Sequence, residues 1–152
     1  MEFPKKFRTC DGNYVDVVSH TLKILKKHPN AKIYIGTDSQ NVKRKTNYVC
    51  VIAYRYGNKG VHYIYNKIKI PRIKDRFQRL FKETEISIEI AQWFTQQISV
   101  DITIDLDYNI SPQHESYLAL NASMGWVGSL GFKVSPKGNE QVAVKAADYH
   151  VR

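Results

Sequence analysis

The sequence predicts an α/β protein with one mixed sheet of five strands and flanking helices. Two observations predict this class. Three strand-like segments with short connections come first, at 32–38, 48–56 and 61–70, and such a run is typical of an antiparallel meander. Helical and strand-like segments then alternate to the end of the chain, which places the fourth and fifth strands parallel to the first.

Turn residues bound the three strands of the meander. The polar and basic segment Asn41–Asn47 is expected to be a hairpin turn, and Gly57-Asn58-Lys59-Gly60 is a strong signal for a second turn. The second strand is rich in Val, Ile and Tyr, which favour strands. Pro71 ends the third strand because proline cannot donate a hydrogen bond to a neighbouring strand.

Apolar residues at helical spacing mark the other elements. Within 13–28 they are Val15, Val18, Leu22 and Leu25. Further helices are expected at 75–98, 111–130 and 140–151, and the last two strands at 101–107 and 132–135. Because 152 residues suit one core, we predict a single domain, 1–152, in which a helical extension (1–30) precedes the α/β core (31–152).

The chain is strongly basic, with a formal net charge of +9 from 23 Lys and Arg against 14 Asp and Glu. Such a balance points to an acidic partner, and nucleic acid is the first candidate. The basic residues are concentrated in two segments, 43–45 and 67–82. The positions expected to contact nucleic acid are Lys43, Arg44, Lys45, Lys69, Arg72, Lys74, Arg76 and Arg79. The alternative is a solvated charged face that binds nothing.

Nothing in the sequence predicts a membrane or secreted protein. No apolar run approaches the roughly 20 residues that cross a bilayer, and the first residues lack the apolar core of a secretory signal. The two cysteines, Cys10 and Cys50, have no metal-ligand spacing. We therefore expect a cytoplasmic protein with reduced thiols and no membrane partner.

Four carboxylates stand at informative places in this basic chain. Asp38 ends the first strand, Asp107 ends the fourth, Glu85 lies early in a helix and Asp148 lies on the last helix. The carboxyl ends of parallel strands meet at one edge of a sheet, where α/β proteins bind their ligands. Taken alone, Asp38 could equally be a residue that caps a turn or a helix.

If the first and fourth strands are neighbours, Asp38 and Asp107 approach each other closely. Their carboxylates then repel one another, and a divalent cation removes the repulsion. A set of oxygen ligands without Cys or His suits Mg²⁺ or Mn²⁺ rather than zinc. Two such ions about 4 Å apart would clamp the attacking and leaving oxygens of a phosphodiester. The expected cofactor is therefore a pair of Mg²⁺ or Mn²⁺ ions, bound together with substrate.

Four short segments carry a resemblance to a known family: Gly36–Gln40, Glu83–Glu89, Leu106–Asn109 and Ala146–Asp148. With the strand order, they resemble the ribonuclease H fold and its acidic active site. They further resemble the uncharacterised bacterial ribonuclease-H-like family of the YkuK type. The resemblance covers residues 31–152. It implies a ribonuclease H-like mixed sheet and a metal-dependent nuclease.

The resemblance also implies a role for each acid. Asp38 would bridge both ions, Glu85 would hold one ion on the substrate side, and Asp107 would lie beside that same ion. Asp148 would support the second ion. The alternative for Asp148 is a surface acid paired with Lys145, one turn earlier.

The choice of helix acid stays open, because Glu83, Glu85 and Glu89 lie close together in the sequence. Glu85 and Glu89 share a helix face, whereas Glu83 lies elsewhere. Asp105 shares a strand face with Asp107 and is an alternate ligand or a supporting group. The other expected supporting residues are Ser39, Gln40, Glu89 and Asn109.

Our first hypothesis is therefore a nuclease that hydrolyses phosphodiester bonds of RNA, DNA or a hybrid by a two-metal-ion mechanism. The second is a non-catalytic nucleic-acid-binding protein on the same scaffold, whose binding would persist without Mg²⁺ and weaken with salt. A nucleotide phosphotransferase ranks below both, since no glycine-rich phosphate loop follows the first strand.

Overall fold

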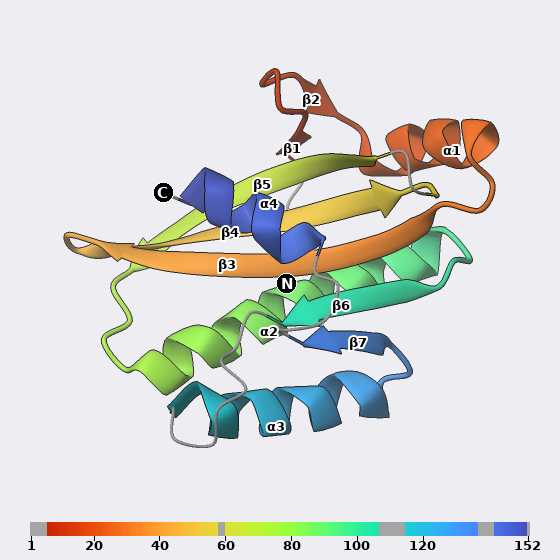
Figure 1. Ribbon diagram of the computed structural model, residues 1–152. Coiled ribbons are helices and arrows are strands. Elements are labelled where there is room, and N and C mark those ends of the chain that lie inside the picture. Colours follow the sequence, from red (N-terminus) through yellow and green to blue (C-terminus); the bar gives the residue numbers. More distant parts are fainter. Residues whose placement is uncertain (1–5, 58–59, 107–114, 137–141, 152) are drawn as a thin grey trace.

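The computed structural model describes residues 6–57, 60–106, 115–136 and 142–151 (Figure 1). One mixed sheet runs in the order β2-β1-β5-β4-β3-β6-β7. In chain order the elements are β1 (Phe7–Arg8), β2 (Tyr14–Val15), α1 (Val17–Lys27), β3 (Lys32–Val42), β4 (Lys45–Arg55), β5 (Val61–Pro71), α2 (Arg76–Gln97), β6 (Ile102–Leu106), α3 (Glu115–Ser129), β7 (Lys133–Pro136) and α4 (Ala143–Val151).

The five central strands have the predicted arrangement. β3, β4 and β5 form an antiparallel meander. β6 pairs with β3 in parallel, and β7 pairs with β6 in parallel. The α/β class and the mixed ribonuclease H-like sheet are therefore confirmed.

The predicted strand count was too low, because two short strands extend the sheet beyond β5. β1 pairs with β5 and β2 pairs with β1, both antiparallel. The apolar spacing within 13–28 predicts a helix over that range, whereas Tyr14 and Val15 form β2. Asp16 explains the later start of α1: its side chain accepts a hydrogen bond from Ser19 N at 3.0 Å, so it caps a helix that begins at Val17.

The turn between β3 and β4 is much shorter than the predicted Asn41–Asn47. Pairing continues to Val42↔Lys45, so only Lys43 and Arg44 connect the strands. Lys43 has a φ of 54°, the left-handed conformation that two-residue hairpin turns require. Polar residues near the turn are thus strand residues on an extended hairpin, which explains why their composition suggested a loop.

Alternate residues of β3 face two different helical layers. Ile33 and Ile35 belong to the larger core cluster, which includes residues of α2 and α3. Tyr34 belongs to a smaller cluster with α4. Figure 1 shows α4 lying over β3 and β4 on one side of the sheet, with α2 on the other. The sheet therefore has two covered faces, and β3 lies between both layers.

The long helix α2 begins at an N-cap, where Gln78 N donates to Asp75 Oδ2 at 2.8 Å. Its buried face is partly polar, since Glu83, Thr84 and Ser87 are buried with its apolar residues. Within the described ranges, no helix combines the length and apolarity needed to cross a membrane.

Candidate active site at the end of β3

Asp38 lies on the face of β3 that α4 covers. Gly36, two residues earlier on that face, is in contact with α4: a Cβ there would lie 2.9 Å from Val144 Cγ2 and 3.0 Å from Ala143 Cβ. The Asp38 side chain is only 8% exposed. Its Oδ1 accepts a hydrogen bond from Ser39 N at 2.9 Å. The sheet thus holds this carboxylate in a fixed, nearly dry position.

A second buried acid approaches the same point of β3 from α2. Ser39 Oγ donates a hydrogen bond to Glu83 Oε2, and Glu83 is 3% exposed. Arg79, one turn earlier on α2, donates from Nη1 to Ser39 Oγ at 2.9 Å and to Ser39 O at 3.1 Å. Asp38 and Ser39 are consecutive residues of β3, so Asp38 faces the α4 side of the sheet and the contact of Ser39 with Glu83 lies on the α2 side.

Glu85, the helix acid named first from the sequence, lies on another flank of α2 than Glu83. The Glu85 side chain is 40% exposed, and its Oε1 lies 3.0 Å from Lys82 Nζ. Glu89, one turn later, is partly buried. The role of Glu85 stays a prediction, whereas Glu83 belongs to the buried stripe of α2. Residues 80, 83, 87, 90 and 94 are spaced three or four apart and all are buried, so Glu83 could have been read as the acid facing the sheet.

Asp105, predicted as an alternate or supporting group, anchors the start of α4. It pairs in register with Gly36 on the neighbouring strand. Its Oδ2 accepts hydrogen bonds from the backbone N of Val142 at 2.9 Å and of Ala143 at 2.7 Å. Asp105 is 1% exposed, and burial raises its pKa to about 6, although these backbone donors act in the opposite direction.

The position of Asp148 follows from how α4 packs against the sheet. His150 faces β5, where its Nε2 lies 2.9 Å from Tyr63 Oη and its ring stacks on Tyr65 at 3.8 Å. Residues two apart on a helix point about 160° away from each other around the axis. Asp148 therefore lies on the opposite flank of α4, on the side of β3 and β6 rather than of β5.

Two predicted residues, Asp107 and Asn109, lie outside the described residues, and their roles remain predictions. Gln40 is exposed and follows Asp38 on the same face of β3. Among the described residues, no group of three His, Cys, Asp or Glu side chains is close enough together to hold a metal ion. The acids of the described part still fit Mg²⁺ or Mn²⁺ in chemistry, since buried carboxylates are hard oxygen ligands whose charge a cation would offset.

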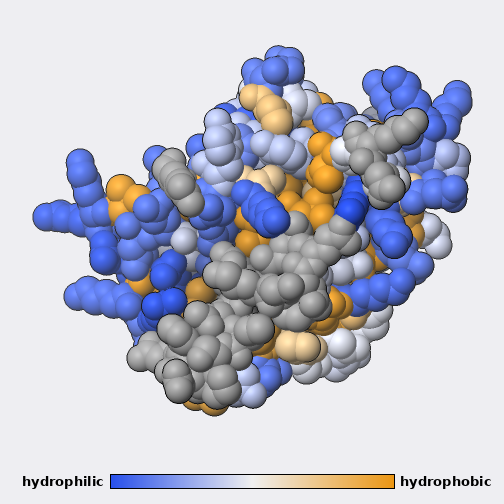
Figure 2. Space-filling view, viewed as in Figure 1, coloured by the Kyte–Doolittle hydropathy of each residue, from blue (hydrophilic) through white to orange (hydrophobic). Residues whose placement is uncertain are grey.

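The predicted basic residues gather beyond Asp38, at the free end of the hairpin. Arg72 ties the segment after β5 to the turn: its N donates to Arg44 O at 3.0 Å and its Nη1 to Lys43 O at 2.7 Å. Lys45 and Lys69 are exposed on the adjoining strands. Figure 2 shows hydrophilic side chains projecting from this end of the sheet, at the left of the view. Lys74 and Arg76 follow in the chain, at the start of α2, and are exposed.

The comparison with protein families decides the classification. The profile described as Ribonuclease H-like matches residues 16–152. The chain belongs to the Ribonuclease H-like family. The matched range includes α1, the meander, α2 and α4, and so all the acids described above. No curated protein matches the chain.

Proposed function

We propose that this Ribonuclease H-like protein is a metal-dependent nuclease whose site lies around Asp38 of β3. The observation that carries the proposal is the burial of two acids at neighbouring positions of this strand, Asp38 on the α4 face and Glu83 against Ser39 on the α2 face. Both are more than nine-tenths buried, in a protein of formal net charge +9. A buried carboxylate is costly unless hydrogen bonds or a cation offset its charge, and a basic surface attracts a polyanion.

In this proposal, Asp38, Glu83, Asp107 and Asp148 would hold Mg²⁺ or Mn²⁺, and bound ions would lower the pKa of water so that it attacks the phosphodiester. Glu83 takes the place that the sequence analysis gave to Glu85. Ser39 Oγ donates a hydrogen bond to the Glu83 carboxylate, and Arg79 Nη1 in turn donates to Ser39 Oγ. Asp105 holds the first turn of α4, and thereby Asp148, against Gly36.

The basic end of the hairpin would hold the nucleic-acid backbone. Lys43, Arg44, Lys45 and Lys69 are exposed, so their side chains are accessible to phosphates. Arg72 keeps the turn in place by bonding to its backbone. Arg79 donates its hydrogen bonds to Ser39, so in this proposal it supports the acids rather than contacting the substrate. Lys74 and Arg76 would extend the contact toward α2.

A cleavage assay on labelled substrates tests the proposal. The panel contains single-stranded RNA, RNA–DNA hybrid, single- and double-stranded DNA and a branched junction, each with Mg²⁺, Mn²⁺ or EDTA. Wild type, Asp38→Asn and Glu83→Gln are compared with Glu85→Gln, a matched change on the exposed flank of α2. We expect cleavage that requires metal, is lost in the first two variants and persists in the third.

Salt-dependent binding without cleavage of any substrate would refute the nuclease. It would instead support a nucleic-acid-binding protein on the same scaffold. Cleavage that survives Asp38→Asn would refute the site rather than the activity.

A further inference from the structure

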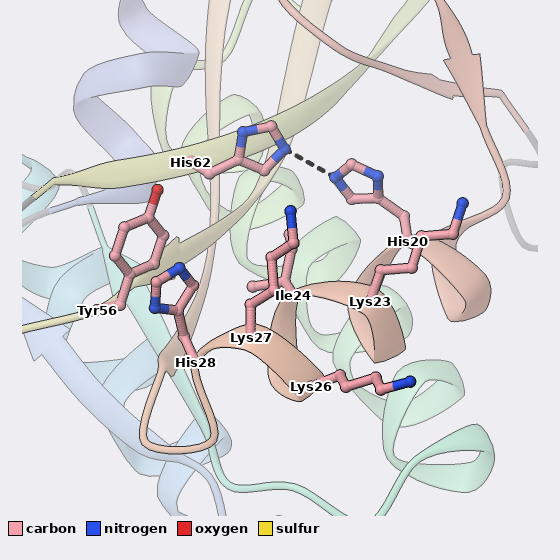
Figure 3. A pocket seen from close by; sticks show the side chains of 8 residues that line it. All are labelled: His20, Lys23, Ile24, Lys26, Lys27, His28, Tyr56 and His62. Carbon is pink, nitrogen blue, oxygen red and sulfur yellow. Dashed lines mark hydrogen bonds between the residues drawn. The ribbon is translucent and has the colours of Figure 1, made fainter.

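A second polar site lies far along the sheet from Asp38, between α1 and the adjoining ends of β4 and β5. It is a cavity of about 770 Å³, a size typical of small-ligand pockets. Figure 3 shows its wall, which α1 supplies together with Tyr56 and His62. None of the acids or basic residues of the candidate active site lines it.

Two histidines meet at one end of this cavity. His20 Nε2 and His62 Nε2 lie 2.7 Å apart, so a single proton is shared between two nitrogens. Partial burial lowers the pKa of both rings, and for His20 the charges of His62 and Lys23 act in the same direction. The Tyr54 ring lies 6.0 Å from both histidine rings, and its Oη lies 2.6 Å from Thr21 Oγ1. The two ring nitrogens therefore lie close together in the free protein, and both rings are harder to protonate than an exposed histidine.

The remaining charged groups of the cavity are cationic. Lys23, Lys26 and Lys27 line it, and no acidic side chain does so among the described residues. In Figure 3, Lys27 extends into the space between the histidine pair and Tyr56, whereas Lys26 points away. A metal cation would be repelled by these ammonium groups. An anion would be attracted by them and would stabilise the protonated histidines.

One wall of the cavity is flat. The rings of His28 and Tyr56 stack at a centroid distance of 4.0 Å and an interplanar angle of 6°. A planar group attached to the anion could lie against this wall. The cavity therefore combines donors for an oxyanion with a surface for a ring.

We propose that this cavity binds a phosphate group, with His20, His62 and Lys27 as donors. A phosphate offers several acceptor oxygens around one centre, and Lys is a common partner for it. Because the acids of β3 take no part, the site is independent of the proposed nuclease activity.

Titration of the full chain in EDTA tests the proposal, with the histidine rings followed by NMR. The probes are inorganic phosphate, a 5′-mononucleotide and a short single-stranded oligonucleotide, which separate free phosphate, nucleotide and nucleic acid as sources. We expect the ring signals of His20 and His62 to shift on addition of phosphate. Lys27→Gln should weaken binding by about tenfold or more, the effect of losing a charge-assisted hydrogen bond.

Lys32→Gln is the matched control, since it removes the same charge from an exposed lysine that does not line the cavity. It should change binding less than about twofold. Equal weakening by both substitutions would overturn the proposal, because it would show diffuse attraction to a basic surface. Unchanged histidine signals with all three probes would also overturn it.

The pH dependence gives an independent readout with sulfate, whose double negative charge is constant between about pH 5.5 and about pH 8. Besides the two histidines, the charged or titratable groups that line the cavity are Lys23, Lys26, Lys27, His28 and Tyr56, and Tyr54 packs against the pair. His28→Gln is measured beside His62→Gln, because His28 is a further imidazole in the same cavity. Sulfate affinity should rise as pH falls, and His62→Gln should remove most of the rise. A flat profile in wild type would contradict the assigned donors.

Discussion

Replacing Gly36 with alanine should displace α4 and destabilise the protein. The added Cβ would lie 2.9 Å from Val144 Cγ2, 3.0 Å from Ala143 Cβ and 3.0 Å from Val144 N. Carbon atoms pack best at about 3.5–4.0 Å, so the first turn of α4 must retreat by roughly 0.5–1 Å. Rotation of one side chain cannot relieve the clash, since two of these three atoms are a backbone nitrogen and a Cβ. We expect a loss of about 1–3 kcal/mol in the free energy of unfolding.

Urea unfolding in EDTA measures this loss without any contribution from metal binding. Gly128→Ala in α3 is the control, because a Cβ there meets nothing within 4 Å and alanine favours helix by about 0.5–1 kcal/mol. Because Asp105 ties the same turn of α4 to β6, the shift should also slow any metal-dependent cleavage that uses Asp148. If Gly36→Ala were as stable as wild type to within about 0.5 kcal/mol, the tight contact between α4 and β3 would be refuted.

Three further predictions concern single interactions. Loss of a residue that only supports a metal ligand lowers activity by about 10–100-fold. Glu83→Gln should lower metal-dependent cleavage by more than this, whereas Glu85→Gln should retain cleavage. Initial rates of the two variants decide between the two acids. Thr21→Val should cost about 1–3 kcal/mol in urea unfolding, because the buried Tyr54 hydroxyl loses its partner, and adding Tyr54→Phe should cost less than the sum of the two changes. Burial lowers the pKa of His62 in the folded state. As pH falls through about 6.5, the unfolded chain therefore binds this proton first, and the free energy of unfolding should fall. His62→Gln should make this fall shallower, and an unchanged slope would contradict the assignment.

The central sheet could be predicted because its signals are local. Strand segments, their order and their turn residues are all visible along the chain, and parallel pairing of β6 with β3 follows from the helix between them. The additional strands β1 and β2 could not be predicted in the same way. Each has two residues, and each is a strand only because a neighbour offers it an edge: β1 pairs with β5, and β2 pairs with β1.

The site was predicted less completely, and for a physical reason. The sequence places Asp38 at a strand end, but β3 continues to Val42, so Asp38 lies within the strand. Its face follows from the alternation of β3. The choice between Glu83 and Glu85 depends on which flank of α2 meets β3, which is a property of tertiary packing. The contact of Ser39 with Glu83 shows which of the two acids faces the sheet, although the buried spacing of α2 contained the signal. The histidine pair could not have been found, since residues 20 and 62 are far apart in the sequence.

The basic residues of β5 have a second effect, which concerns strand pairing rather than nucleic acid. β1 pairs with β5 at Arg8↔Tyr65, and the described residues record no pairing of β5 with β1 beyond that point. Lysine and proline at a strand edge oppose pairing with a strand from another molecule. Lys67, Lys69 and Pro71 occupy that part of β5. Neutralising these lysines to weaken nucleic-acid binding would therefore also remove a barrier to aggregation, so loss of binding in such variants has to be measured on protein shown to be monodisperse.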